Sequence, residues 1–145
     1  MPLLDKLLIL AVALQVALTF LVLVRMGAER VPRVIRGEIK AADIAVDRDA
    51  YPLKAKLLSN SFDNQFQLPV LFYVAALLTL IIGSAGWLEV ILAFLFVVLR
   101  IVHFAIHTGS NDVVRRFQIY CAGMLTLMIF WIVLVARVLM LPGAL

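Results

Sequence analysis

The sequence predicts an all-α membrane protein, in which four transmembrane helices form one bundle and one domain over residues 1–145. Of the 145 residues, 65% are hydrophobic and 15% are charged, and the mean hydropathy is +1.10. This composition is far more apolar than that of an ordinary soluble domain. The apolar residues gather in four segments, each close to the roughly 20 residues that cross a hydrocarbon core of about 30 Å. We expect spans at residues 5–25, 64–83, 87–108 and 115–139, and a long loop at 26–59.

The first span is predicted from residues 7–24, which carry no charge. A cleaved signal peptide is the alternative. Its apolar region would be unusually long, the charges of Asp5 and Lys6 cancel in front of it, and Arg25 follows as a stop. We therefore expect this segment to remain as the first helix.

The second span rests on residues 68–82, which are apolar apart from Tyr73 and Thr79. We expect the helix to begin near Lys54 and to run into this segment. Pro69 then falls in its first membrane turns, where it lacks the N–H that would bond to the Gln65 carbonyl. The sequence therefore predicts a kink at Pro69.

The third and fourth spans are predicted from residues 87–107 and 117–136, the latter uncharged and containing the single cysteine, Cys121. The connections at 83–86 and 108–112 are short, so the last three helices should lie side by side. In the second connection, Gly109 suits a left-handed helix end, and Ser110 or Asn111 suits the cap of the next helix.

The orientation is predicted from the basic residues. Residues 25–56 contain eight Lys or Arg, the last connection is followed by Arg115 and Arg116, and residues 83–86 contain none. An even number of spans places both basic loops on one side, which we expect to be the cytoplasm. Topology and anionic lipids then explain the net charge of +4 without a nucleic-acid partner. Within the loop, residues 33–46 could form an amphipathic surface helix.

Arg100 is the first candidate for a functional site. A guanidinium inside a span costs at least about 2.5 to 3.5 kcal/mol, so it needs a polar partner or a cavity within the bundle. His103 and His107 follow at helical spacing and share its face. Arg100 is therefore either a structural counter-ion or a functional group.

Matching polar stripes lie on the neighbouring helices. Asn60, Asn64 and Gln67 recur at i, i+4 and i+7, and Arg116 and Tyr120 at i and i+4. Counting depth at 1.5 Å per residue, we expect Gln67 to face Arg100. These groups predict a cationic pocket that is open to the cytoplasm. Such a pocket suits an anionic, polar molecule that binds or reacts alongside an apolar molecule. Alternatively, Asn64 and Gln67 only hydrogen-bond neighbouring helices, and Arg116 only belongs to the excess of basic residues on the cytoplasmic side.

His103 and His107 also have the i, i+4 spacing of a helical metal site. A third ligand would have to come from another segment, from Asp63, Asp112 or Cys121. No Glu lies between the two histidines, as it does in the helical zinc motif of metalloproteases. We therefore expect no metal.

The residues resemble the MAPEG superfamily, the membrane-associated proteins in eicosanoid and glutathione metabolism, from about Asn60 to Arg137. The resemblance lies in Asn64-x-x-Gln67 followed by Pro69, in Arg100-x-x-His103 with a ring at position 107, and in a basic turn leading to Tyr120. It implies a homotrimer of four-helix subunits that bind glutathione between neighbours near the cytoplasmic face. A bacterial-type member would lie in the inner membrane.

The resemblance also implies roles for single residues. Arg116 would stabilise the glutathione thiolate and act as the catalytic residue. The implied contacts or supports of glutathione are Arg25, Asn60, Asn64, Gln67, Arg100, His103, His107 and Tyr120. The chain differs from the family where Gln67 stands for Glu, Asn60 for Arg and His107 for Tyr.

Three functions follow as hypotheses. The first is a glutathione-dependent transferase or peroxidase that acts on lipophilic electrophiles or hydroperoxides entering from membrane lipid. The second is a non-catalytic lipid-binding or scaffold protein of the same fold. The third, a small anion transporter, would use the cationic cavity, but the sequence has no pair of broken helices in inverted repeats.

Overall fold

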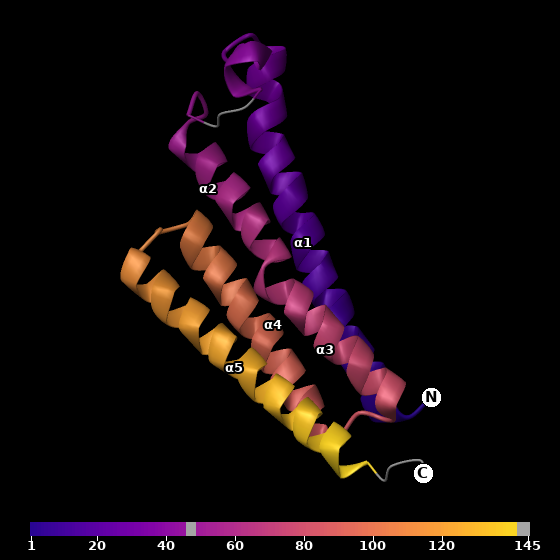
Figure 1. Cartoon of the computed structure of the whole chain (residues 1–145). Helices are drawn as coiled ribbons and strands as arrows, with labels where there is room; N and C mark the ends of the chain where they lie inside the picture. The colour runs from indigo at the N-terminus through magenta and orange to yellow at the C-terminus, as the bar shows by residue number, and fades with distance from the viewer. Residues whose placement is uncertain (46–48, 142–145) are drawn as a thin grey trace.

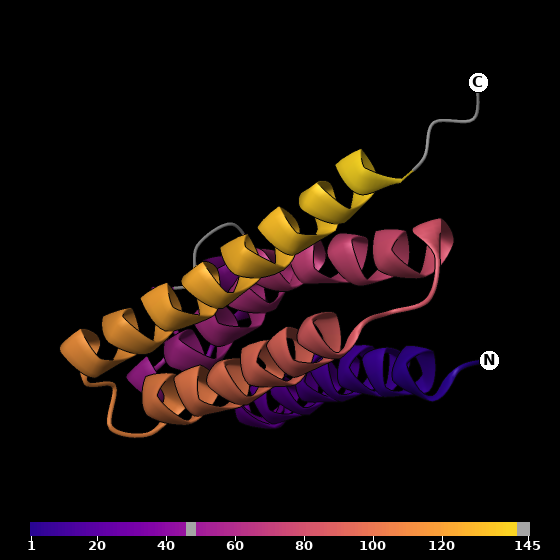
Figure 2. The ribbon, with the colours of Figure 1, turned by 90° about the horizontal axis from the view of Figure 1, so that it is seen from below.

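The computed structural model describes residues 1–45 and 49–141, and every regular element in these ranges is helical. The helices are α1 (Leu3–Ile35), η1 (Ala41–Ile44), α2 (Leu53–Asp63), η2 (Asn64–Phe66), α3 (Leu68–Ile82), α4 (Trp87–Thr108) and α5 (Val113–Met140). They form four rods: α1, the run from α2 through η2 to α3, α4, and α5. The rods lie side by side (Figures 1 and 2), and α4 packs against α1 and α5. The predicted all-helical bundle is confirmed.

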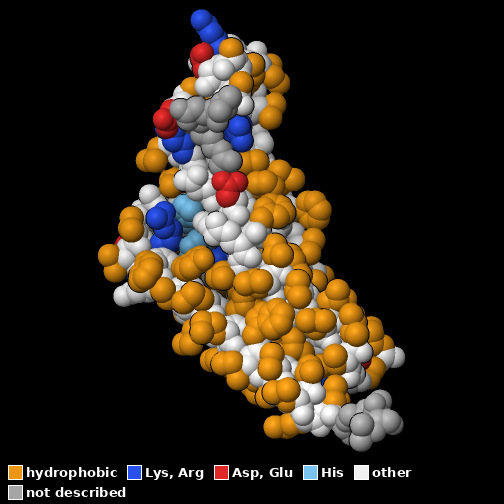
Figure 3. Space-filling model, in the orientation of Figure 1, with side chains coloured by type: hydrophobic (Ala, Val, Ile, Leu, Met, Phe, Trp, Pro, Cys, Tyr) orange, Lys and Arg blue, Asp and Glu red, His pale blue; other side chains and the backbone are white. Residues whose placement is uncertain are grey.

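The surface of the bundle is apolar over most of its length. Figure 3 shows hydrophobic side chains over the lower part of the molecule, with charged side chains gathered towards the upper end. Leu77, Ile81 and Ile91 are 59%, 68% and 58% exposed. Four helical segments among the described residues are long and apolar enough to cross a membrane. The protein is therefore an integral, multi-pass membrane protein.

The core of the bundle is held by aromatic packing between α3, α4 and α5. The ring centroid of Phe72 lies 4.9 Å from that of Phe96 and 6.3 Å from that of Phe130, and all three side chains are fully buried. Such pairs contribute about 0.5 to 1.5 kcal/mol beyond the area they bury. They fix the spacing of the three helices below the polar residues.

The second rod is interrupted where the sequence predicts a kink. α2 ends at Asp63, η2 forms one tight turn, and Gln67 leaves helical geometry with φ −104° and ψ −104° before α3 begins. Pro69 lies in the first turn of α3, where its missing N–H is tolerated. The structure thus has a helix interruption just before Pro69, where the sequence predicts a kink, and it divides the rod into a polar part and an apolar part.

A buried amide pair joins α1 to this interruption. The Gln15 Nε2 donates to the Gln65 Oε1 at 3.0 Å, and the Gln65 Nε2 donates to the Ser61 carbonyl at 3.2 Å. Both glutamine side chains are buried. A hydrogen bond of this kind between membrane helices contributes about 0.6 to 2 kcal/mol. It holds the helix break against α1.

The opposite end of the bundle is closed by a second polar cluster. Glu89 accepts from Arg137 Nη1 at 3.0 Å and from the Gly86 N–H at 3.1 Å. Asp5 accepts from the Ala85 N–H at 2.7 Å, and Arg137 also donates to the Ser84 carbonyl. This cluster ties the start of α1 and the end of α5 to the turn between α3 and α4, all of which lie at one end in Figure 1.

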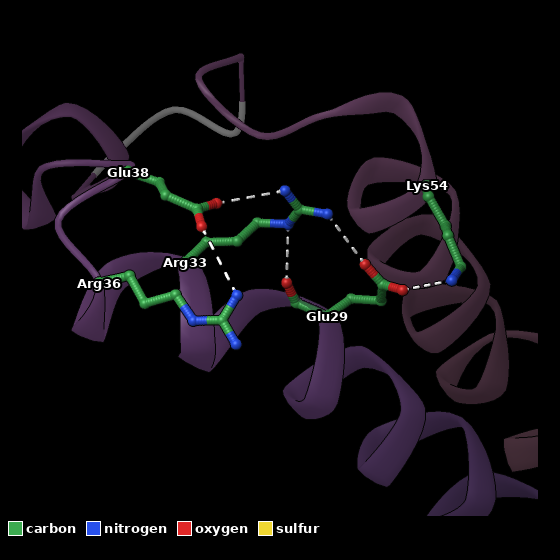
Figure 4. A network of polar contacts seen from close by, with 5 residues as sticks. All are labelled: Glu29, Arg33, Arg36, Glu38 and Lys54. Carbon is green, nitrogen blue, oxygen red and sulfur yellow. Dashed lines mark hydrogen bonds and ion pairs between the residues drawn. The ribbon is translucent and has the colours of Figure 1, made fainter.

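The connection between the first two rods contains more helix than the sequence suggests. α1 continues to Ile35, and its Glu29 accepts from Arg33 of the same helix at 3.2 Å and pairs with Lys54 of α2 (Figure 4). The predicted amphipathic helix over residues 33–46 is wrong. Gly37, with φ +70°, ends the helical path, and within the described part of residues 33–46 the short η1 follows. Val46 lies outside the described residues.

Candidate functional site

A cleft of about 480 Å³ opens between the polar part of the second rod and the start of α5. Figure 3 shows the pale blue histidine side chains in a recess beside blue basic side chains, at the end of the bundle that carries most of the charge. The cleft is lined by Asn60, Asp63, Asn64, Gln67, His103, His107, Val113, Arg116, Phe117 and Tyr120. Seven of these ten residues were predicted as site residues. They come from the polar stripes predicted on three different helices, and the structure brings these stripes together at one cleft.

The α4 side of the cleft is formed by two stacked histidines. His103 and His107 are each 3% exposed, and their ring centroids lie 5.6 Å apart at an interplanar angle of 75°. The His103 ring also lies 5.9 Å from the Tyr120 ring. Among the described residues, no group of three His, Cys, Asp or Glu side chains is placed to hold a metal ion.

Arg116 is held at the α5 side by the turn before it. Its Nη1 donates to the Asn111 Oδ1 at 2.8 Å, and Asn111 adopts the left-handed conformation with φ +50°. The predictions for this turn are wrong: Gly109 has φ −99°, and Asp112 caps α5 by accepting from the Arg115 N–H at 3.1 Å. Asn tolerates the left-handed region because its short side chain can bond locally. The hydrogen bond of Asn111 thereby holds the Arg116 guanidinium beside the cleft.

The α2 side of the cleft carries amides and one carboxylate. Asn60, Asp63 and Gln67 are exposed there, and Asn64 is half-buried. Sequence reasoning considered Asp63 only as a metal ligand and missed its place in the cleft. Its spacing of three from Asn60 and four from Gln67 was the available signal, because such residues share one helical face.

Arg100 lies behind the cleft rather than in it. Its side chain is 2% exposed, and its Nη2 donates to the backbone carbonyl of Asn64 at 2.9 Å. The expectation that it faces Gln67 is wrong, because depth counted along a straight helix ignores the turn at η2. Asn64 begins η2, so this bond joins α4 to the interruption of the second rod. This contact favours a structural role for Arg100.

Arg25 lies in a different recess, on the other side of α2. That recess has a volume of about 340 Å³ and is lined by Arg25, Ala28, Glu29, Lys54, Leu58 and Thr108. Within the chain, the structure therefore does not bring Arg25 to the cleft.

An apolar groove continues from the cleft into the membrane-spanning part of the bundle. It has a volume of about 280 Å³ and is lined by Leu68, Leu71, Met124, Leu127, Met128, Trp131 and Ile132. Leu68 follows Gln67 directly, and Met124 lies one helical turn after Tyr120. A polar cleft and an apolar groove thus share one face of the molecule, between the second rod and α5.

Comparison with known proteins gives one match. The family model described as the MAPEG family matches residues 8–136, which is most of the chain. Searches among curated proteins and among solved structures find no match.

We predict that Arg100→Leu lowers the free energy of unfolding by about 1 to 3 kcal/mol, because it removes the buried hydrogen bond that joins α4 to the interruption of the second rod. Arg100→Lys keeps a donor and should lose less. Thermal unfolding in detergent measures both, with Arg115→Leu as the control at an exposed arginine. Unfolding of Arg100→Leu at or above the wild-type temperature would contradict the structural role.

Proposed function

The chain belongs to the MAPEG family, and we propose that it is an integral membrane glutathione-dependent transferase or peroxidase that acts on lipophilic electrophiles or hydroperoxides. Family membership supports a glutathione-related membrane function in general. The observation that carries the finer proposal is the meeting of seven predicted residues around one cleft.

The cleft suits glutathione in size and in chemistry. Its volume of about 480 Å³ falls within the range of small-molecule sites. Glutathione carries two carboxylates, one amine and a thiol. Arg116 and the amide side chains of Asn60, Asn64 and Gln67 supply donors for the carboxylates. Asp63 supplies a carboxylate for the amine, on the same stripe as Gln67, where the family often has Glu.

Arg116 is the proposed catalytic residue. A free thiol has a pKa of about 8.5, and an adjacent guanidinium lowers that pKa by about 1 to 3. Asn111 holds Arg116 at the cleft, so the charge is in place before glutathione binds. The thiolate would then attack an electrophile or a hydroperoxide.

The apolar groove between α3 and α5 supports a lipophilic second substrate. A molecule dissolved in the bilayer would enter along Leu71 and Met128 and bring its reactive end to the cleft. In this proposal the polar co-substrate enters from the basic end of the bundle, which faces the cytoplasm. The two substrates would meet near Gln67 and Tyr120.

We further propose a homotrimer, as is general in the family. The recess that contains Arg25 lies on another side of the subunit from the cleft. An assembly in which these two sides meet would bring Arg25 of one subunit to the glutathione of its neighbour. Arg25 would then be a binding residue that one subunit alone cannot use.

We predict that the detergent-purified protein has the mass of three 16.1 kDa subunits after correction for bound detergent and lipid. Native mass spectrometry or light scattering measures this directly. A monomer that still binds glutathione would rule out a site shared between subunits.

We predict that Arg116→Ala lowers kcat/KM for the glutathione reaction by about 100- to 1000-fold, because it removes the charge aimed at the thiolate. Arg115→Ala is the matched control, since Arg115 is exposed, pairs with Asp112 and does not line the cleft. The measurement is thiol turnover with a lipophilic electrophile in detergent.

Unfolding temperatures of both variants should stay near that of the wild type. Equal activity in Arg116→Ala and the wild type would mean that another group stabilises the thiolate. Glutathione binding without turnover for any electrophile or hydroperoxide would instead support the non-catalytic alternative.

A further inference from the structure

The thiol proton needs an acceptor if the thiolate is to form in the cleft. Arg116 can stabilise the negative charge, but a guanidinium is always protonated and cannot take a proton. Among the described residues that line the cleft, His103, His107 and Asp63 can accept a proton. One of them would be the acceptor if glutathione binds here as proposed above.

Burial separates these candidates. Asp63 is exposed on α2, whereas the imidazoles of His103 and His107 are each 3% exposed and line the cleft. Histidine is also the side chain that most often acts as a general base in enzymes. The acceptor should be one of the two histidines.

His107 carries a buried nitrogen that the fold leaves unused. Its Nδ1 has no hydrogen-bond partner among the described residues, and its ring contacts that of His103, which in turn lies beside the Tyr120 ring. A buried polar group without a partner is uncommon and calls for an explanation, of which a catalytic role is one. His107 Nδ1 is therefore not held by another side chain that would prevent it from bonding to a ligand.

Depth in the helix pair distinguishes His107 from His103. α4 and α5 run antiparallel, and the contact between the His103 and Tyr120 rings shows which residues are level. His107 lies four residues nearer the turn than His103, and Arg116 lies four residues nearer the turn than Tyr120. His107 is therefore level with Arg116. A sulfur held by Arg116 is nearer in depth to His107 than to His103.

We propose that His107 is the general base that takes the proton of the glutathione thiol and returns it to the product. The S–H bond breaks, the proton bonds to an imidazole nitrogen, and the electron pair stays on sulfur. The sulfur then forms a bond to a carbon electrophile such as an epoxide. The C–O bond breaks, and its oxygen takes the proton back from the imidazolium.

The charged and titratable groups around His107 come from three helices. Arg100 and His103 lie on α4, Arg116 and Tyr120 on α5, and Asp63 on α2. The guanidinium groups keep their charge across the working pH range. A change in the pH profile on replacing His107 would therefore report the imidazole or the thiol.

The test compares His107→Phe with His103→Phe in the full-length protein. Phenylalanine keeps a ring in the stack and removes the proton acceptor. General base catalysis contributes 100-fold or more, so we expect kcat of His107→Phe to fall by at least about 100-fold at pH 7. The KM for glutathione should change little, and the loss should shrink as the pH rises towards that of thiol ionisation. His103→Phe should lose much less.

Rescue by free imidazole provides a second readout. His107→Ala leaves space at the cleft, and added imidazole should restore part of its turnover but not that of His103→Ala. An unchanged kcat and pH profile in His107→Phe would overturn the proposal, and so would a larger loss in His103→Phe or in Asp63→Asn. Calorimetric titration with glutathione separates the two levels of inference. If the wild type binds and turns over glutathione and His107→Phe is equally active, only the role of His107 as the base is refuted. If the wild type does not bind glutathione, the proposed function is refuted as well.

Discussion

The constraint on which this structure depends is that no backbone carbonyl can go without a donor inside a bilayer. The second rod departs from regular helical geometry at Gln67, and Pro69 has no N–H to donate. Arg100 donates to the Asn64 carbonyl at this interruption, and the amide pair of Gln15 and Gln65 holds the interruption against α1. Part of the cost of burying the guanidinium is offset by this bond to the neighbouring rod.

The helix break also creates the conditions for the site. Above it, α2 presents amides and Asp63; below it, α3 presents an apolar face with Leu68 and Leu71. The change in chemistry occurs within one helical turn, opposite a change of the same kind on α5 between Tyr120 and Met124. A polar and a lipophilic reactant can consequently meet there without either leaving its preferred surroundings.

Much of the fold could be predicted from the sequence, because uncharged segments of span length and one proline determine the rods and the kink. The cleft residues could be predicted because i, i+4 spacing places polar side chains on one helical face. The partner of Arg100 could not be predicted, since it is a backbone carbonyl, and its position depends on the turn at η2. The sequence indicates Asn111 as a possible helix cap, whereas in the structure it is left-handed and accepts a hydrogen bond from Arg116. Its conformation depends on the whole turn, which the residue types alone do not reveal.

The central claim is that the cleft between the second rod and α5 binds glutathione beside Arg116. An experimental structure of the protein in lipid nanodiscs with glutathione added tests it most directly. The account predicts density for the tripeptide along Asn60, Asn64 and Gln67, with its sulfur near Arg116 and His107. Glutathione bound elsewhere, or lipid density filling this cleft in the presence of saturating glutathione, would contradict it.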